Sequence, residues 1–137
     1  MSDRRVTLVD ANVLLDLVTG DSDWAPWSVR QLNNARRDGS VAINPIVYAE
    51  ISVGYARIEE CDEAFPESQL ERLPLPWDAA FLAGKVFHAY RKAGGSRLSP
   101  LPDFYIGAHA AVTGMRLLTR DATRYRTSFP GLELVAP

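Results

Sequence analysis

Four acidic residues could do chemistry together if the fold gathered them. They are 40, 53 and 18 positions apart along the chain: Asp10, Glu50, Asp103 and Asp121. At about 5 Å and an effective dielectric of about 20, each pair of like charges costs roughly 3 kcal/mol. Proteins accept this cost when the acids are protonated or when a cation lies between them. Carboxylate oxygens suit Mg²⁺ or Mn²⁺, and such an ion can activate a water and stabilise charge on a phosphate. The four acids therefore predict metal-dependent phosphoryl chemistry.

The elements that would position these acids alternate between strands and helices. Strand-like runs are expected at 6–9, 41–43, 115–119 and 132–135, with a short edge strand at 73–75. Helical patterns are expected at 24–37, 45–56, 77–92 and 102–113, a helix or turn at 14–17 and 121–125, and a helical stretch interrupted by Pro66 at 62–72. This alternation predicts an α/β fold with a mainly parallel central sheet flanked by helices.

Local signals mark the ends of two of these helices. Asn44 followed by Pro45 is typical of an N-cap and the first helical residue. This start places Glu50 about a turn and a half into its helix. A later helix begins at Pro102 and is expected to end at Gly114.

The topology of such a sheet sends all four acids to one rim. In a parallel sheet the carboxyl ends of the strands and the amino ends of the helices share an edge, where ligands bind. Asp10 closes the first strand, and Asp121 follows a later one. Glu50 lies near the start of its helix, and Asp103 lies in a first turn, where a negative charge is favoured.

The segments around these acids resemble the four motifs of the PIN domain family. They occur in the family's order and are LVDANVLL (8–15), YAEI with Gly54 (48–54), DFYIGA (103–108) and LTRD (118–121). The resemblance covers essentially the whole chain. The chain length and the tail at 125–130 are similar to those of bacterial VapC-type toxins. The resemblance implies a single PIN-like three-layer domain over residues 1–137.

The resemblance also implies an activity, a cofactor and partners. It implies an endoribonuclease that uses Mg²⁺, or Mn²⁺ in its place, and is the toxin of a toxin–antitoxin pair. Carried over onto this sequence, the residues that hold the metal and catalyse the reaction would be Asp10, Glu50, Asp103 and Asp121. Asn12 and Thr119 would be supporting polar residues, because the Thr119 hydroxyl could hold Asp10 in place. The partners would be a cognate antitoxin protein, an RNA substrate, and a second copy in a homodimer or a higher toxin–antitoxin assembly.

Arginines near the predicted rim are candidates for contacting RNA phosphates. Arg120 precedes the fourth acid, and Arg97 lies in a Gly- and Ser-rich segment at 94–101. That segment varies in the family, so the resemblance does not define its contacts. Both residues could instead be ordinary exposed arginines. Sequence-specific readers of RNA usually take single-stranded loops, so a structured RNA with an exposed loop is the expected target.

Each acid also has an ordinary structural interpretation. Asp10 could cap the following helix, Asp103 could be a favourable first-turn acid, and Asp121 could be an N-cap. Glu50 has mostly apolar neighbours and could pair with an arginine such as Arg57. The joint occurrence of four acids at one rim favours the metal-binding interpretation.

Two other functions compete with the nuclease. The triplet Asp10-Ala11-Asn12 loosely resembles the Asp-x-Asp start of haloacid-dehalogenase-type phosphatases, which use an aspartyl nucleophile. Here the second aspartate is an asparagine, and the only lysines, Lys85 and Lys92, lie at no predicted strand end. The other alternative is a non-catalytic PIN-like binding module. The complete set of acids argues against it, because a module without a metal gains nothing from their repulsion.

Composition limits the kind of nucleic-acid binding that is expected. The chain has 137 residues, 47% hydrophobic and 23% charged, as in a single soluble domain. A net charge of −2 argues against a broad basic surface for nucleic acid. With the four acids neutralised by metal, however, the remainder is positive. Modest non-specific RNA affinity is then expected, with specificity from shape and a few arginines.

The sequence also indicates a compartment. Cys61 is the only cysteine, which excludes an intrachain disulfide and a cysteine-based zinc site. The apolar run at 6–9 is too short for a signal peptide, and no run approaches the about 18 residues of a membrane helix. A cytoplasmic protein with no membrane partner is expected.

Overall fold

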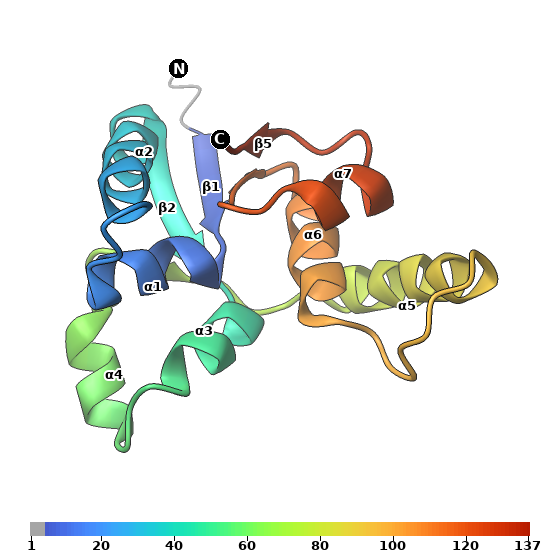
Figure 1. Ribbon diagram of the computed structural model, residues 1–137, viewed down its shortest axis with the longest axis horizontal. Coiled ribbons are helices and arrows are strands. Elements are labelled where there is room, and N and C mark those ends of the chain that lie inside the picture. The colour runs from blue at the N-terminus through green and yellow to red at the C-terminus, as the bar shows by residue number, and fades with distance from the viewer. Residues whose placement is uncertain (1–4) are drawn as a thin grey trace.

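The computed structural model describes residues 5–137 and is built around a five-stranded sheet (Figure 1). The sheet consists of β1 (Arg5–Val9), β2 (Gly39–Ile43), β3 (Glu71–Arg72), β4 (Arg116–Leu118) and β5 (Leu134–Val135). Its strand order is β3-β2-β1-β4-β5, and every pair is parallel. Central β1 places Leu8 beside Ala42 of β2 and Leu117 of β4. The predicted parallel sheet is confirmed; the first four residues of the predicted domain lie outside the described part.

Helices cover both faces of this sheet. They are α1 (Ala11–Thr19), α2 (Ala25–Asp38), α3 (Pro45–Ser52), α4 (Ile58–Ala64), α5 (Trp77–Lys92), α6 (Pro102–Thr113) and α7 (Thr123–Ser128). Figure 1 shows α1 and α2 on one side and α5, α6 and α7 on the other, while the starts of α1, α3 and α6 converge where β1 ends. Among residues 5–137, no helix is both long enough and apolar enough to cross a bilayer.

The core lies between the sheet and these helices. Leu8 and Val9 of β1 and Leu117 and Leu118 of β4 are fully buried, as expected for parallel strands covered on both faces. Gly107 of α6 has a packing role, because a Cβ atom there would lie 2.4 Å from the ring of Phe129, just after α7. The absence of a side chain at this position lets the chain after α7 pack directly on α6.

Several predicted boundaries need correction. Helix α5 has the predicted bounds, but α3 ends at Ser52, four residues early, because Val53 and Gly54 face solvent and have no core to cover. Helix α4 begins and ends earlier than the predicted stretch at 62–72 and stops before Pro66. The edge strand also lies earlier than predicted, although the Leu73 N–H still donates to the Ile43 carbonyl at 2.9 Å.

The predicted helix start at Asn44 is confirmed, and it couples α3 to α6. Asn44 Oδ1 accepts a hydrogen bond from the Val47 N–H at 2.9 Å. Its Nδ2 lies 3.0 Å from Nδ1 of His109, and both side chains are buried. Because the amide nitrogen can only donate, the His109 ring accepts through Nδ1 and is neutral, and burial lowers its pKa.

Replacing Asn44 by alanine is expected to lower the free energy of unfolding by about 2 kcal/mol. The change removes the cap of α3 and leaves Nδ1 of buried His109 without its donor. Urea unfolding measures the loss. Asn33→Ala on the exposed surface of α2 is the matched control, and its expected effect is below about 0.5 kcal/mol. Equal losses in the two variants would show that the buried cap contributes nothing.

Candidate metal centre

Asp10 is held at the rim by the last backbone pairing of the central strands. Its N–H donates to the Leu118 carbonyl at 2.9 Å, and its side chain then begins α1 as the N-cap. Oδ1 accepts from the Ala11 N–H at 2.8 Å. Oδ2 accepts from the Thr119 hydroxyl and from the Tyr125 hydroxyl, each at 2.9 Å. The capping interpretation is therefore correct, and the carboxyl also belongs to a buried network at the rim.

The two predicted supporting residues contact this network. Thr119 is fully buried, and besides bonding Asp10 its Oγ1 lies 3.3 Å from Nδ2 of Asn12. The same oxygen lies 3.2 Å from the N–H of Asp121. Asn12 Oδ1 in turn accepts from the Arg120 N–H at 3.0 Å. Asn12 and Thr119 thus tie the segment after β4 to the start of α1.

Glu50 on α3 is the least satisfied of the four acids. Its Oε1 is buried and has no hydrogen-bond partner among the described residues. Burial, together with the charges of Asp10 and Asp103, raises the pKa of this carboxyl to about 7. The alternative pairing with Arg57 is wrong, because that side chain pairs with Glu59 at 3.2 Å. A half-buried glutamate without a cation beside it is costly in a structural role.

Asp103 completes a group of three neighbouring carboxyls. It lies in the first turn of α6, with Oδ1 3.4 Å from the Tyr125 hydroxyl and Oδ2 3.5 Å from Nε of Arg124. Burial raises the pKa of Asp103, while the Arg124 charge opposes the rise. Asp10 has a raised pKa as well, mainly through burial and in part through the Asp103 charge.

Asp121 lies at the margin of this group. Its side chain is exposed, and its Oδ1 accepts from the Thr123 N–H at 3.3 Å beside the start of α7. Its charge contributes to the raised pKa of Asp103. The cap of α7 is Ala122, so the N-cap interpretation of Asp121 is wrong.

The acids are neighbours without forming a ready-made ligand set. Within residues 5–137, no three carboxyl, imidazole or thiol groups are gathered closely enough to hold one ion as they stand. Tyr125 lies between Asp10 and Asp103, and Arg124 neutralises part of the charge of Asp103. The group nevertheless fits a cation, because one would partner the bare Oε1 of Glu50 and lower all three raised pKa values.

The two arginines predicted to bind substrate have different surroundings. Arg120 pairs through Nε with buried Asp16 of α1 at 2.9 Å, and its guanidinium lies 5.4 Å from the centre of the Trp24 ring. Arg97 is exposed in the loop between α5 and α6. Its backbone is held there, because its carbonyl accepts from Nη1 of Arg91 at 2.8 Å. Of these two arginines, only Arg97 has a guanidinium with no hydrogen bond, ion pair or cation–π contact to another described residue.

Sequence reasoning missed Tyr125 as a part of the site. It appeared there only within the tail at 125–130, yet its hydroxyl reaches Asp10 and Asp103. A signal was available, because Tyr125 and Phe129 are spaced four residues apart and so mark one buried face of a short helix. That spacing predicts burial but not the partner of the hydroxyl.

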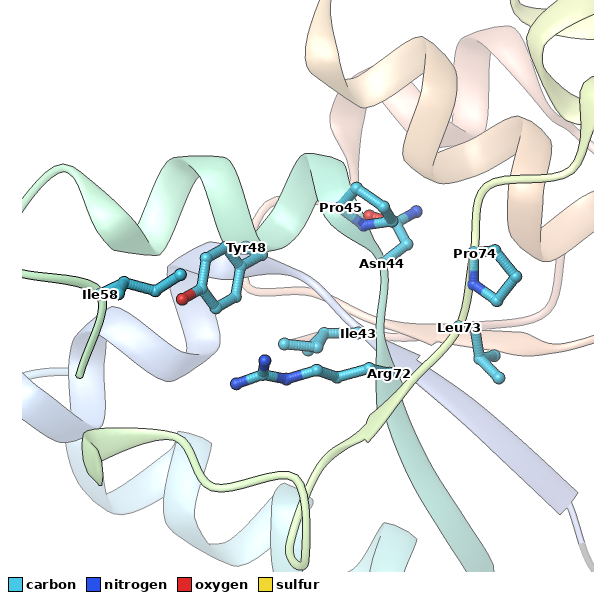
Figure 2. Close-up of a pocket in the computed structure, with 8 residues that line it drawn as sticks. All are labelled: Ile43, Asn44, Pro45, Tyr48, Ile58, Arg72, Leu73 and Pro74. Carbon is cyan, nitrogen blue, oxygen red and sulfur yellow. The ribbon is translucent and has the colours of Figure 1, made fainter. Parts of the chain in front are cut away.

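A separate pocket of about 350 Å³ opens at the β3 edge of the sheet (Figure 2). It is lined by Ile43, Asn44, Pro45, Tyr48, Ile58, Arg72, Leu73 and Pro74. Tyr48 and Arg72 face one another across it, with the guanidinium 4.9 Å from the ring centre (Figure 2). Tyr48 and Glu50 are two residues apart on α3 and so point to opposite sides of that helix. This pocket is therefore distinct from the group of acids.

The family of this chain follows from its match to a family model. A family model for the PIN domain matches residues 7–130, so this chain belongs to the PIN domain family. The predicted family membership is confirmed. A comparison with curated protein sequences finds no match.

Solved structures share the fold over nearly the whole chain. VapBC2 from Rickettsia felis, bound to a DNA fragment from its promoter, has a TM-score of 0.74 and 18% identity and covers 96% of this chain and 98% of its own. VapBC-1 from nontypeable Haemophilus influenzae has a TM-score of 0.70 and 16% identity, with coverage of 96% and 97%. A toxin–antitoxin complex from Klebsiella pneumoniae has a TM-score of 0.67 and 23% identity, with coverage of 94% and 95%. At these identities the likeness shows the fold.

Proposed function

We propose that this chain is a metal-dependent endoribonuclease and the VapC-type toxin of a toxin–antitoxin pair. The observation that carries the proposal is the buried, unpartnered Oε1 of Glu50 beside two further carboxyls with raised pKa values. Asp10, Glu50 and Asp103 would hold Mg²⁺ or Mn²⁺, and Asp121 would contribute from the margin. All four lie in the segments that resemble the family's motifs and within the residues 7–130 that the family model matches.

The chain's own residues suit hydrolysis of a phosphodiester. When bound, the ion would lower the pKa of a water and stabilise charge on the phosphate. Thr119 and Asn12 keep the Asp10 carboxyl in one orientation through the bonds described above. The carboxyl of Glu50 has a pKa of about 7 without metal, so near neutral pH it can release its proton when a cation arrives.

We assign recognition of the RNA to its shape and to a few arginine side chains. Arg97 is exposed in the loop that leads into α6, and the first turn of α6 carries Asp103. The backbone N–H of Arg120 donates to Asn12, but the Arg120 side chain is paired with Asp16. We therefore assign phosphate contact first to Arg97, and to Arg120 only if its ion pair opens. A single-stranded loop of a structured RNA remains the expected target.

The expected partner is a cognate antitoxin. The similar solved structures include toxin–antitoxin complexes, and one of them is bound to promoter DNA. An antitoxin segment would lay an amphipathic helix in a groove of this chain and could bring a basic side chain to the acids. A homodimer, or a larger toxin–antitoxin assembly in the cytoplasm, completes the proposal.

The test uses purified protein, total RNA and either Mg²⁺, Mn²⁺ or EDTA. We expect cleavage at a limited number of sites with either metal and no cleavage in EDTA. Addition of the small protein encoded by the preceding reading frame should suppress cleavage if that protein is the antitoxin. Cleavage that persists in EDTA, or intact RNA with both metals, would refute the proposed activity.

The aspartyl phosphatase is less well supported by the structure. Lys85 and Lys92 both lie on α5, and Lys85 stacks on the ring of Phe81 at 4.9 Å. Neither lysine follows a strand to stand beside Asp10. Trapping of a phosphoaspartate at Asp10 would favour that alternative. A binding module without catalysis would leave the stability of the protein unchanged by metal.

A further inference from the structure

We propose that Tyr125 is a positioning residue of the metal centre, and that its hydroxyl fixes the Asp10 carboxyl and its spacing from Asp103. The inference rests on the proposed function and assigns a role to a residue outside the four acidic motifs. It comes from one observation: a buried hydroxyl on α7 lies between the carboxyl that follows β1 and a carboxyl of α6, 2.9 Å from Asp10 Oδ2 and 3.4 Å from Asp103 Oδ1.

The hydrogen-bond count shows what this hydroxyl does. A phenol has one hydrogen to donate, and the shorter distance assigns it to Asp10. Oδ2 of Asp10 then accepts from both Thr119 and Tyr125, while Oδ1 accepts from the Ala11 N–H. Three donors on two oxygens fix the plane of the carboxylate. Asp103 Oδ1 lies 3.4 Å from the same hydroxyl oxygen, which has no second hydrogen to donate to it, so the hydroxyl acts as a spacer between the two carboxyls.

The packing of α7 keeps this hydroxyl in place. Phe129 follows Tyr125 by four residues, and its N–H donates to the Tyr125 carbonyl at 2.8 Å. Its ring occupies the space above Gly107, where a Cβ atom would meet it at 2.4 Å. Gly107 lies one helical turn after Asp103 on α6, so the anchor of α7 is directly beside the acid. Helix α6 thereby positions both Asp103 and the tyrosine that contacts it.

The competing interpretation is that Tyr125 only fills the core. It is 1% exposed and is among the largest fully buried side chains, so the ring contributes to packing. Phenylalanine keeps that ring and removes only the hydroxyl. The two interpretations therefore predict different metal dependence for Tyr125→Phe, because the ring packs in the same way in this variant and in the wild type.

The experiment compares the metal dependence of wild-type protein, Tyr125→Phe and Tyr55→Phe. Tyr55 is the matched control, since its ring packs on Phe65 and its hydroxyl bonds no described residue. The Mn²⁺ concentration for half-maximal RNA cleavage and for half-maximal thermal stabilisation is measured. We expect both to rise by about 10- to 100-fold in Tyr125→Phe and to stay unchanged in Tyr55→Phe. The melting temperature in EDTA should fall by only a few degrees in Tyr125→Phe, because buried Asp10 loses one of its three donors, and it should not change in Tyr55→Phe.

Phe129→Leu provides a second arm that leaves the hydroxyl intact. It loosens the anchor of α7 on Gly107, so a smaller rise in the required Mn²⁺ is expected. Wild-type metal dependence in Tyr125→Phe would overturn the positioning role while leaving the proposed function standing. If Tyr125→Phe does not fold, an unchanged Mn²⁺ requirement in Phe129→Leu would overturn the positioning role instead. A wild-type protein that neither binds Mn²⁺ nor cleaves RNA would refute both proposals.

Discussion

Replacing Asp10 by asparagine is expected to slow Mg²⁺-dependent RNA cleavage by at least about 100-fold while the protein stays folded. The substitution removes the charge at the carboxyl of the site that accepts the most hydrogen bonds. Metal ions supply several kcal/mol of transition-state stabilisation, and each 1.4 kcal/mol corresponds to a factor of ten in rate. The fold should tolerate the amide, because asparagine can still accept from the Ala11 N–H and cap α1. Thr119 can also turn its hydroxyl to the Asp121 carbonyl, 3.2 Å away.

Single-turnover cleavage of a structured RNA measures this effect. Asp78→Asn is the matched control, since Asp78 also lies at the start of a helix but is exposed on α5 and is not among the charges that raise the pKa of Asp10, Glu50 or Asp103. The control should cleave at the wild-type rate. If Asp10→Asn also cleaves at that rate, the chemistry does not pass through this carboxyl.

Replacing Glu50 by glutamine is expected to make the metal-free protein more stable at pH 8. The folded state raises the pKa of this carboxyl from 4.5 to about 7. Between these values the folded protein binds a proton that the unfolded chain releases, so stability falls as pH rises through this range. Below about pH 4.5 the Glu50 carboxyl is protonated in both states and costs no stability. Above about pH 7 it is ionised in both states, and burial of its charge lowers the stability by the full amount. The cost is up to about 3 kcal/mol, and less to the extent that water screens the half-buried carboxyl.

Urea unfolding in EDTA at pH 5 and pH 8 checks this sign. Wild-type protein should lose stability between the two values, and Glu50→Gln should lose less; Asp10 and Asp103 keep part of the trend because their pKa values are raised as well. Saturating Mg²⁺ should stabilise the wild type and leave Glu50→Gln nearly unaffected. Glu63→Gln, on the exposed side of α4, should behave as the wild type does. A wild-type protein that gains stability from pH 5 to pH 8 would contradict the assigned burial of Glu50.

Local signals were sufficient for much of the fold. The bounds of α5, the Asn44 cap and the parallel sheet follow from periodicity, capping chemistry and strand–helix alternation. The rim positions of Asp10 and Asp103 then follow from topology. Boundaries failed where burial decides, as at the end of α3, because sequence does not show that Val53 meets only solvent.

Contacts between distant side chains could not be predicted in this way. Tyr125 and Asp10 are 115 residues apart, and Arg120 and Asp16 are 104 apart. Periodicity indicates that a residue is buried or exposed, but not which polar group it meets. The ion pair that engages Arg120 and the hydroxyl that contacts two acids therefore emerged only from the structure.

The most direct test of the metal centre is to locate Mn²⁺ in crystals of the wild-type protein by its anomalous scattering. We predict density bound by the carboxyls of Asp10, Glu50 and Asp103, with Oε1 of Glu50 among the ligands and the Tyr125 hydroxyl still bonded to Asp10. Density only elsewhere on the protein, or none at Mn²⁺ concentrations that support RNA cleavage, would contradict the proposed centre.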